Sequence, residues 1–519
     1  PEPGPPGGGG LMAGRLEKAV AEALAHLRSL PDLIEVEAYA CWSARLTVRL
    51  NYTSHLPCHG IEEPKSEEEA GVAVRALFRT PEGRRVGFGS APGPPTGAAW
   101  QEALARARQG AVADPDFPGL PAGTGERRRL RRHHDPALLR LSDEALVAAG
   151  WRVLDGALRT FDAADVLRST DPASLGIIVG GDVTIRQETM AVGSSHLPAQ
   201  ADTAASALVN VTAMVEAWDA KGTGGQVVAR LTDLTEAAGA EAAAAALAVR
   251  GGVRVPGGVL PVIFGPAAVA DLLTYLILPS VSLDHLLRGT SAFQGQLGQR
   301  IAAPALSLAD DGAAPGLPGS RGITCEGLPT GRTRLIERGV LVGTLANAYE
   351  QGRALRNGAA AAKLGCEPNG AAEALLPRNG FRLAGGLRSA EVPVGIAASN
   401  VLLTGEPAEP LSTLLARVGR GLYLGRLWYT YPINGLRAGD FTGTAVADSF
   451  LIRDGRLAEP LAVNAIRVND NIRRLLTAIL GIGGETRRVA GWGADEVILA
   501  PPVAVADVPV EAIGPGGAV

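Results

Sequence analysis

The second half of the chain is interrupted by turn-forming residues at short intervals, and this spacing limits what it can fold into. From about Pro256 to the end, short apolar and β-branched runs alternate with Gly, Pro, Asn and Asp. Runs such as Leu260–Phe264, Asn400–Thr404 and Phe441–Ile452 are typical of strands bounded by turns. Residues 256–519 are therefore predicted to form a large, mainly antiparallel β domain. Helices are predicted within it at Ala267–Leu276, Leu411–Val418 and Ile472–Ile479.

The first half predicts two smaller domains in which helices and strands are mixed, so the fold class is α+β. Residues 15–108 place strand-like runs between amphipathic helices at Arg15–Ser29 and Thr96–Arg108. Residues 141–255 form the second predicted domain, with Ser142 as a helix N-cap. Its predicted strands are Leu175–Val179 and Val183–Arg186, and its further helices are Asp202–Val215 and Leu231–Val249. Residues 109–140, rich in Pro and Gly, are predicted to be a linker, and residues 1–14 a disordered tail.

Composition excludes some classes of partner and location. The 519 residues carry a formal net charge of −4, so no large basic surface is expected and nucleic acid is not an expected partner. Four widely separated cysteines without a CxxC pair suit a reducing compartment. Proline and aspartate interrupt the longest apolar stretch, Val259–Pro279, so no membrane segment is predicted. Without the pattern of a secretory signal, we expect a cytoplasmic protein.

Several short motifs follow one another in a fixed order along the C-terminal half. They are Arg288-Gly289-Thr290-Ser291-Ala292-Phe293, Ala309-Asp310-Asp311-Gly312, Gly327-Leu328-Pro329, Pro377-Arg378-Asn379, Gly439-Asp440-Phe441-Thr442-Gly443 and Arg453-Asp454-Gly455. Their order and spacing resemble the TldD/PmbA family, and Gly71–Ala76 is similar to that family's first domain. Taken singly, each acidic-glycine motif also fits a simple scaffold turn. Arg288 could likewise serve either a carboxylate or phosphate contact or a buried salt bridge.

The resemblance implies a zinc peptidase motif that this sequence lacks. TldD-type members carry HExxxH on a helix ahead of the first motif, where two imidazoles bind the metal and the Glu acts on the attacking water. Here the corresponding segment, Leu272–Ser280, contains neither His nor Glu. His285 is followed by leucines, and we interpret it as an ordinary surface or interface histidine. The thiolate ligand expected near the C-terminus is also missing, because Gly481–Pro502 contains no cysteine.

These two absences predict a PmbA (TldE)-like subunit with no catalytic, cofactor-binding or metal-binding residues of its own. The resemblance implies a heterodimer with a TldD-like metallopeptidase subunit that supplies zinc and acts on unfolded or precursor peptides. Alone, such a chain would be inactive. One alternative is a stand-alone homodimer that binds a peptide or small molecule without hydrolysing it.

Another alternative is a divergent hydrolase built on His55, Cys58 and His59, the densest group of metal-ligand residue types. A fourth ligand is not evident beyond Glu62 or Glu63, and the close spacing favours an ordinary loop. His133-His134 is interpreted as a solvated linker face. The sequence Gly193-Ser194-Ser195-His196 lacks the second glycine of a nucleophile elbow, and Gly222-Thr223-Gly224-Gly225 lacks the Lys-Ser/Thr ending of a phosphate loop.

Overall fold

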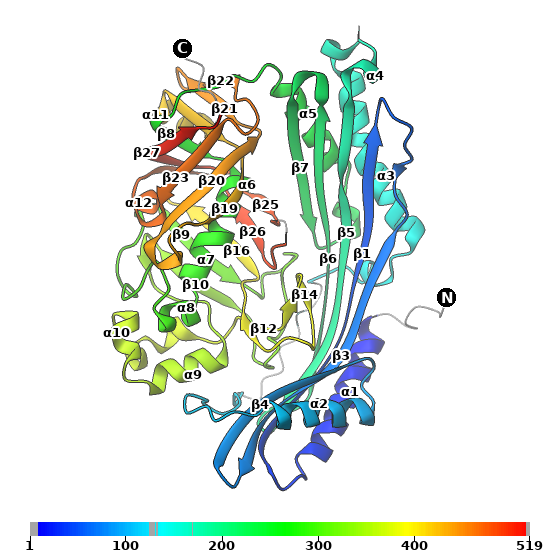
Figure 1. The fold of residues 1–519 in the computed structure, drawn as a ribbon, viewed down its shortest axis with the longest axis vertical. Coiled ribbons are helices and arrows are strands. Elements are labelled where there is room, and N and C mark those ends of the chain that lie inside the picture. The colour runs from blue at the N-terminus through cyan, green and yellow to red at the C-terminus, as the bar shows by residue number, and fades with distance from the viewer. Residues whose placement is uncertain (1–8, 124–129, 131–132, 169, 492, 515–519) are drawn as a thin grey trace.

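The N-terminal half forms one long, curved antiparallel sheet of seven strands (Figure 1). The computed structural model describes residues 9–123, 130, 133–168, 170–491 and 493–514. The strand order is β4-β3-β1-β5-β6-β7, with β2 paired to β1. The strands are β1 (Leu33–Thr53), β2 (Gly60–Ile61), β3 (Lys65–Thr80), β4 (Gly83–Pro92), β5 (Ile177–Ser194), β6 (Gln200–Val215) and β7 (Ala220–Val228). Pairing of β1 with β5 runs from Glu37 opposite Ser194 to Thr53 opposite Ile178. One sheet therefore contains strands from both predicted N-terminal domains. The boundaries between these domains remain a prediction.

Helices cover the outer face of this sheet, and the C-terminal domain covers part of its inner face (Figure 1). Side chains alternate between the faces because successive residues of a strand point in opposite directions. Ala38 and Ala40 of β1 pack in the core beneath the outer helices. Tyr39 and Cys41, between and beside them, pack against Cys325 of the C-terminal domain. Both faces of the sheet's middle are thus buried, and polar side chains on the inner face must find partners there.

The outer helices approach the sheet closely at glycines. The helices of this half are α1 (Gly9–Leu27), α2 (Gly97–Gln109), α3 (Asp143–Ala163), α4 (Pro172–Leu175) and α5 (Ala237–Ala248), with short 3₁₀ turns at Pro136–Arg140, Asp165–Leu167, Glu216–Trp218 and Leu231–Asp233. Gly224 on β7 lets α5 approach, since a Cβ there would lie 2.0 Å from the carbonyl oxygen of Ala238. At Gly239 on α5, a Cβ would lie 1.9 Å from the carbonyl oxygen of Val153 on α3.

We expect Gly239→Ala to destabilise the protein because the added methyl group would force α3 and α5 apart. Overpacking of this kind costs about 1–3 kcal/mol of unfolding free energy, which thermal unfolding followed by circular dichroism would measure. Gly14→Ala is the matched control, because Gly14 also lies in a helix but a Cβ there meets nothing within 4 Å. That control should be neutral or stabilising by up to about 1 kcal/mol. Equal effects of the two substitutions would contradict the packing argument.

Some predicted elements of the first half are wrong. Asp202–Val215 is not a helix but belongs to strand β6, because pairing with both β5 and β7 overrides the helix propensity of its alanines. The two strands predicted on either side of Gly180-Gly181 are one continuous strand, β5.

The start of the first helix also differs from the prediction. Residues 9–14 of the predicted tail begin α1, where Met12 packs against the core, while residues 1–8 lie outside the described residues. Ser142 caps α3 as predicted, since its side chain accepts a hydrogen bond from the amide of Ala145.

The C-terminal domain contains two large mixed sheets around one apolar core. The ten-stranded sheet contains β8 (Gly258–Phe264), β17 (Ala408–Glu409), β18 (Gly421–Leu424), β19 (Arg426–Pro432), β20 (Asp440–Ala447), β21 (Phe450–Arg453), β22 (Arg456–Pro460), β23 (Ile466–Asn471), β24 (Ile479–Gly483) and β27 (Val503–Ala512). The six-stranded sheet contains β9 (Leu306–Asp311), β10 (Arg332–Glu337), β11 (Val340–Leu341), β16 (Asn400–Gly405), β25 (Arg487–Val489) and β26 (Val497–Ala500). Most pairings are antiparallel, as predicted, and the fold is α+β.

Short elements complete this domain. Two strand pairs, β12 (Gly380–Phe381) with β15 (Gly395–Ile396) and β13 (Leu383–Ala384) with β14 (Leu387–Arg388), reach toward the N-terminal sheet. The helices are α6 (Pro266–Leu272), α7 (Leu278–Ser280), α8 (Leu283–Arg288), α9 (Ala348–Arg356), α10 (Ala360–Leu364), α11 (Leu411–Val418) and α12 (Ile472–Thr477), with 3₁₀ segments at Pro368–Leu375 and Leu436–Ala438. A π-helical segment, Leu273–Ile277, joins α6 to α7. Among the described residues, no helix has the length and apolar character needed to span a bilayer.

Candidate functional site

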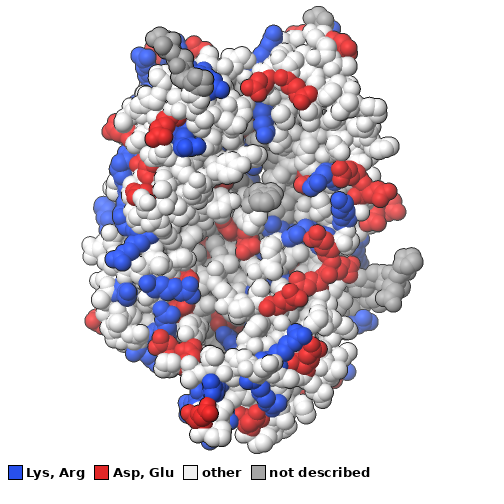
Figure 2. All heavy atoms as spheres, viewed as in Figure 1, with Lys and Arg blue, Asp and Glu red and all other residues white. Residues whose placement is uncertain are grey.

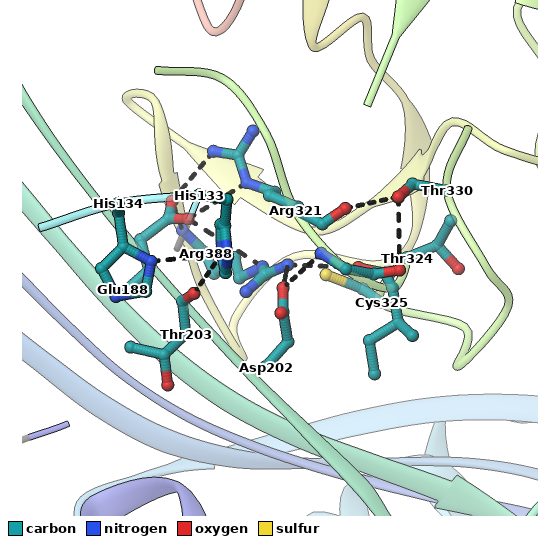
Figure 3. A network of polar contacts seen from close by, with 12 residues as sticks. His133, His134, Glu188, Asp202, Thr203, Arg321, Thr324, Cys325, Thr330 and Arg388 are labelled. Carbon is teal, nitrogen blue, oxygen red and sulfur yellow. Dashed lines mark hydrogen bonds and ion pairs between the residues drawn. The ribbon is translucent and has the colours of Figure 1, made fainter. Parts of the chain in front are cut away.

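The two halves of the molecule meet along a seam (Figure 1). On the face shown in Figure 2, Lys and Arg side chains are interspersed with Asp and Glu. Buried ion clusters lie within the seam, one of them drawn in Figure 3. The first, here the Arg388 cluster, comprises Glu188 on β5, Asp202 on β6, Arg321 and Arg388 (Figure 3). Arg388 Nη2 donates to Asp202 Oδ2 at 2.7 Å, and Arg321 donates to both oxygens of Glu188 at 3.1 Å. Burial opposes ionisation, but the charges of Arg321 and Arg388 hold the pKa of Glu188 below its ordinary value. Charge pairing therefore joins the C-terminal domain to the inner face of the sheet.

A second cluster, here the Arg382 cluster, lies further along the same face. Glu37 on β1 accepts hydrogen bonds from Arg75 on β3 at 2.6 Å and from Arg382 at 2.8 Å. The Arg382 guanidinium lies 5.1 Å from the ring centre of Tyr39 and 4.9 Å from that of Phe88. Such cation–π contacts suit a desolvated arginine. The Arg382 side chain is fully buried and the Arg75 side chain is only 14% exposed, so this cluster fixes the geometry of the seam.

The histidine pair beside the seam is structural, and its interpretation as a solvated linker face is wrong. His133 is buried, and its Nε2 lies 2.8 Å from the carbonyl oxygen of Thr203 on β6 (Figure 3). His134 Nδ1 lies 3.1 Å from the same His133 nitrogen. Burial and the neighbouring His133 lower the pKa of His134 to about 4, so His134 is neutral at physiological pH. Most of the basic run at 127–132 lies outside the described residues.

The segment expected to replace a metal-binding helix, Leu272–Ser280, packs within the C-terminal domain. It spans the end of α6, the π-helical segment and α7, and most of its apolar side chains enter the core. Thr274 projects from it and donates a 2.5 Å hydrogen bond to Glu496, which lies just before β26. The segment Leu272–Ser280 and the C-terminal segment Gly481–Pro502 therefore contact each other. The contact is made by a hydroxyl and a carboxylate, and not by the His and Cys side chains of a zinc site.

The residues at this meeting point do not fit a zinc site. Zinc sites in proteins are dominated by His nitrogen and Cys sulfur, usually with three or four such ligands converging. Within the described part of the chain, no group of three or more His, Cys, Asp or Glu side chains is placed to hold a metal ion. Thr274 and Glu496 alone cannot complete the usual coordination.

A cavity of about 320 Å³ opens beside this helix, between the C-terminal domain and strand β7 with helix α5. Its wall includes Asp271 on α6, Arg426 on β19 and Asp448, which precedes β21. Burial raises the pKa of Asp271 to about 7, although the charge of Arg426 and the backbone amide of Leu427 act in the opposite direction. Burial likewise raises the pKa of Asp448 to about 6, while its Oδ2 accepts a 2.6 Å hydrogen bond from Thr223. Clusters of perturbed carboxyl groups in a cavity are frequent marks of functional sites.

The comparisons with known proteins agree with the motif order. Residues 257–512 match the model of the PmbA/TldA metallopeptidase C-terminal domain. The C-terminal half of this chain is a PmbA/TldD-family domain. A metalloprotease from Methanothermobacter thermautotrophicus is 26% identical over 243 residues, which are 46% of this chain and 45% of that protein. One from Synechocystis sp. is 27% identical over 44% of each chain. The aligned part thus spans less than half the length of these relatives.

Similarity of fold extends over nearly the whole chain. The crystal structure of TldE from Thermococcus kodakarensis superposes with a TM-score of 0.75, covering 95% of this chain and all of that one. Sequence identity in this superposition is 19%, so the match concerns the fold. The curved N-terminal sheet is therefore shared with a TldE structure, beyond the part that the family model matches.

The PmbA/TldD-like motifs are held together by buried hydrogen bonds. Asp310 on β9 accepts from the amide and hydroxyl of Ser399 at 2.7 and 2.9 Å, and from Asn379 Nδ2 at 2.7 Å. Two separate motifs thus contact each other directly and support the scaffold. Arg288, by contrast, is exposed and lies 3.8 Å from Asp284, one turn earlier on α8. The structure assigns it a weak surface ion pair instead of a buried one.

The remaining candidates from the sequence lie in local structure. His55 and Cys58 occupy the exposed loop between β1 and β2, where Cys58 Sγ accepts from the amide of Thr53 and His55 lies 3.5 Å from Glu216. Ser194 Oγ accepts hydrogen bonds from the amides of the next turn, at His196 and Leu197. The run Gly222–Gly225 is part of strand β7 and not a phosphate loop. None of these groups reaches the cavity except Thr223, Gly224 and Gly225 in its wall.

Sequence reasoning missed Asp271, Arg426, Asp448 and Glu496. They come from α6, β19, the start of β21 and the start of β26, with no motif linking them. Only Asp271 carried a signal, as an acid within an otherwise apolar helix. Its role depends on neighbours more than a hundred residues away, which the helix pattern does not identify.

Proposed function

We propose that this chain is a non-catalytic, TldE-like subunit of a heterodimeric zinc-dependent peptidase that acts on unfolded or precursor peptides. The metal would be supplied by a TldD-like partner, whose Glu would help deprotonate a zinc-bound water. This chain would provide part of the substrate chamber. The observation that carries the proposal is the segment Leu272–Ser280, which contacts the C-terminal segment through Thr274 and Glu496 in place of zinc ligands. The names of the metalloprotease relatives and the TldE-like fold support it.

We further propose that the complex works in the cytoplasm. All four cysteines are free thiols, and Cys41 and Cys325 are buried near each other without forming a disulfide. Cysteines that are widely separated in the sequence and form no disulfide suit a reducing compartment. Burial raises the pKa of both thiols, so neither is poised as a nucleophile.

The proposal predicts zinc and peptidase activity only in the pair. This chain would be purified alone and after co-expression with an HExxxH-bearing paralogue, and zinc would be counted by mass spectrometry. Hydrolysis would be followed with a quenched fluorescent, unstructured peptide. We expect no turnover and less than about 0.1 zinc per chain alone, and one zinc per heterodimer with turnover in the pair.

Two controls make this test decisive. A partner with Glu→Gln in its HExxxH motif should bind this chain and zinc but lose turnover, because the group acting on the water is gone. Stoichiometric zinc and turnover in this chain alone would contradict the proposal. A stable homodimer that does not bind the paralogue would favour the alternative that this chain is a homodimeric binding protein without hydrolase activity.

A further inference from the structure

Two cations beside the seam cavity share one aromatic ring. Lys221 on β7 lies with its Nζ 4.9 Å from the ring centre of Trp428, and the guanidinium carbon of Arg426 lies 5.8 Å from it. Arg426 also forms part of the cavity wall. In the part of the chain that the structure describes, no hydrogen bond or ion pair within 4.0 Å is made by either charged group. Burial and the charge of Arg426 lower the pKa of Lys221, as expected for neighbouring cations.

The nearby acids do not neutralise this pair fully. Asp448 uses Oδ2 to accept from Thr223, and Asp271 accepts from the backbone of Leu427. Both carboxyls are desolvated, so each holds its proton to a higher pH than an exposed aspartate. Arg487, the next arginine in the wall, is already paired with Glu241 on α5. The guanidinium of Arg426 therefore presents several unused N–H donors at the cavity wall.

Exposed aromatic side chains follow one another along β19, and the first of them, Trp428, is the ring that both cations contact. Trp428, Tyr429 and Tyr431 on β19 are 41%, 74% and 52% exposed, in a chain whose aromatic content is only 4%. Strand β19 is an edge of the ten-stranded sheet, and its pairing with β20 shifts between Trp428 and Tyr431. At this shift Tyr429 has a φ of 52°, a conformation that is uncommon for an aromatic residue. A bulge at an edge hinders the addition of another strand. These three rings lie outside the cavity wall, whose own aromatic residues are Tyr423 and Phe450.

We propose that the cavity binds the C-terminal carboxylate of a short peptide, with Arg426 as its donor and with Tyr423 and Phe450 of the cavity wall against its apolar side chains. Guanidinium groups bind carboxylates through two parallel hydrogen bonds. A volume of about 320 Å³ suits a ligand of dipeptide size, at the lower end of ordinary ligand pockets. The two aromatic rings in the wall, Tyr423 and Phe450, favour a peptide over a bare inorganic anion. The choice of a peptide as the ligand rests on the proposed function. The site itself does not, because all of its residues belong to this chain.

The test is binding of Ala-Phe and of its C-terminal amide, Ala-Phe-NH₂, to the purified full chain by isothermal titration calorimetry. We expect the free acid to bind and the amide to bind at least about tenfold more weakly, because the amide lacks the charge that Arg426 recognises. Arg426→Gln should weaken binding of the acid by about tenfold or more and have little effect on the amide. Arg420→Gln, a change to an exposed arginine at the end of α11, is the matched control and should leave both affinities unchanged.

Three results would overturn the inference: no binding of the acid, equal affinity for acid and amide, or binding unaffected by Arg426→Gln. Competition by inorganic phosphate as strong as that of Ala-Phe would also overturn it, since the site would then recognise anions in general. Circular dichroism of each variant confirms folding, and Lys221→Gln, which removes a charge outside the cavity wall, should weaken binding less than Arg426→Gln does. This binding experiment does not depend on zinc or on turnover by the heterodimer. The carboxylate-binding proposal and the proposed function can therefore fail independently of each other.

Discussion

Arg388→Met should lower the free energy of unfolding by about 3–5 kcal/mol, the usual cost of removing one partner from a buried ion pair. Arg388 is fully buried on β14, and its guanidinium contacts Asp202 on β6. Burial alone would lower the pKa of this guanidinium, but the charges of Asp202 and Glu188 raise it. Methionine would fill much of the space but would leave the Asp202 carboxylate without its cation. Urea unfolding at pH 7 measures the loss.

A matched control separates this loss from the removal of any arginine. Arg453→Met removes an exposed arginine that lies 3.3 Å from Glu459 on the β21–β22 hairpin, and should change stability by less than about 1 kcal/mol. The double variant Arg388→Met/Asp202→Asn should recover part of the lost stability, because the orphaned charge is removed. If the double variant is no more stable than the single one, cavity formation explains the loss and the charge argument is wrong.

The sequence predicted the β-rich C-terminal domain well because its signals are local. Asp454 and Gly455 form the turn of the β21–β22 hairpin, both with positive φ, as an Asp-Gly pair between apolar runs predicts. Helix starts were also predictable, since Ser142 and Thr96 each cap the helix that follows. Such features depend on a few adjacent residues and need no knowledge of the fold.

Elements that depend on distant partners were harder to predict. Strand β6 is rich in alanine, and its identity is fixed by β5 and β7 on either side. Residues such as Asp202 and Arg388 are 186 positions apart and gave no joint signal, although they form one buried pair. The cavity was harder still to predict from the sequence, because its wall contains residues from both halves of the molecule. The absence of the zinc-binding motif could be recognised in the sequence. The polar groups that lie at the seam could be identified only from the structure.

Asp271→Asn should stabilise the protein at pH 8 and have little effect near pH 4. Burial raises the pKa of Asp271 from 3.8 to about 7 in the folded state, so folding favours the protonated form. The proton is bound more tightly by the folded than by the unfolded chain, and stability must fall as pH rises from about 4 to about 7. One pKa unit is worth about 1.4 kcal/mol, which sets an upper bound of about 4 kcal/mol on this loss. Partial solvent access should reduce the effect to about 2 kcal/mol.

Asparagine removes the ionisation but keeps an oxygen that can accept from the amide of Leu427. The stability difference between Asp271→Asn and the unmodified protein should therefore grow between pH 4 and pH 7 and then level off. Thermal unfolding at half-unit pH steps measures it, with Asp233→Asn, a change to an exposed acid, as the control that shows no such growth. A difference that is constant with pH would mean that Asp271 ionises normally in the folded protein. The seam cavity would then contain an ordinary carboxylate beside Arg426, and the cation would be compensated without any ligand.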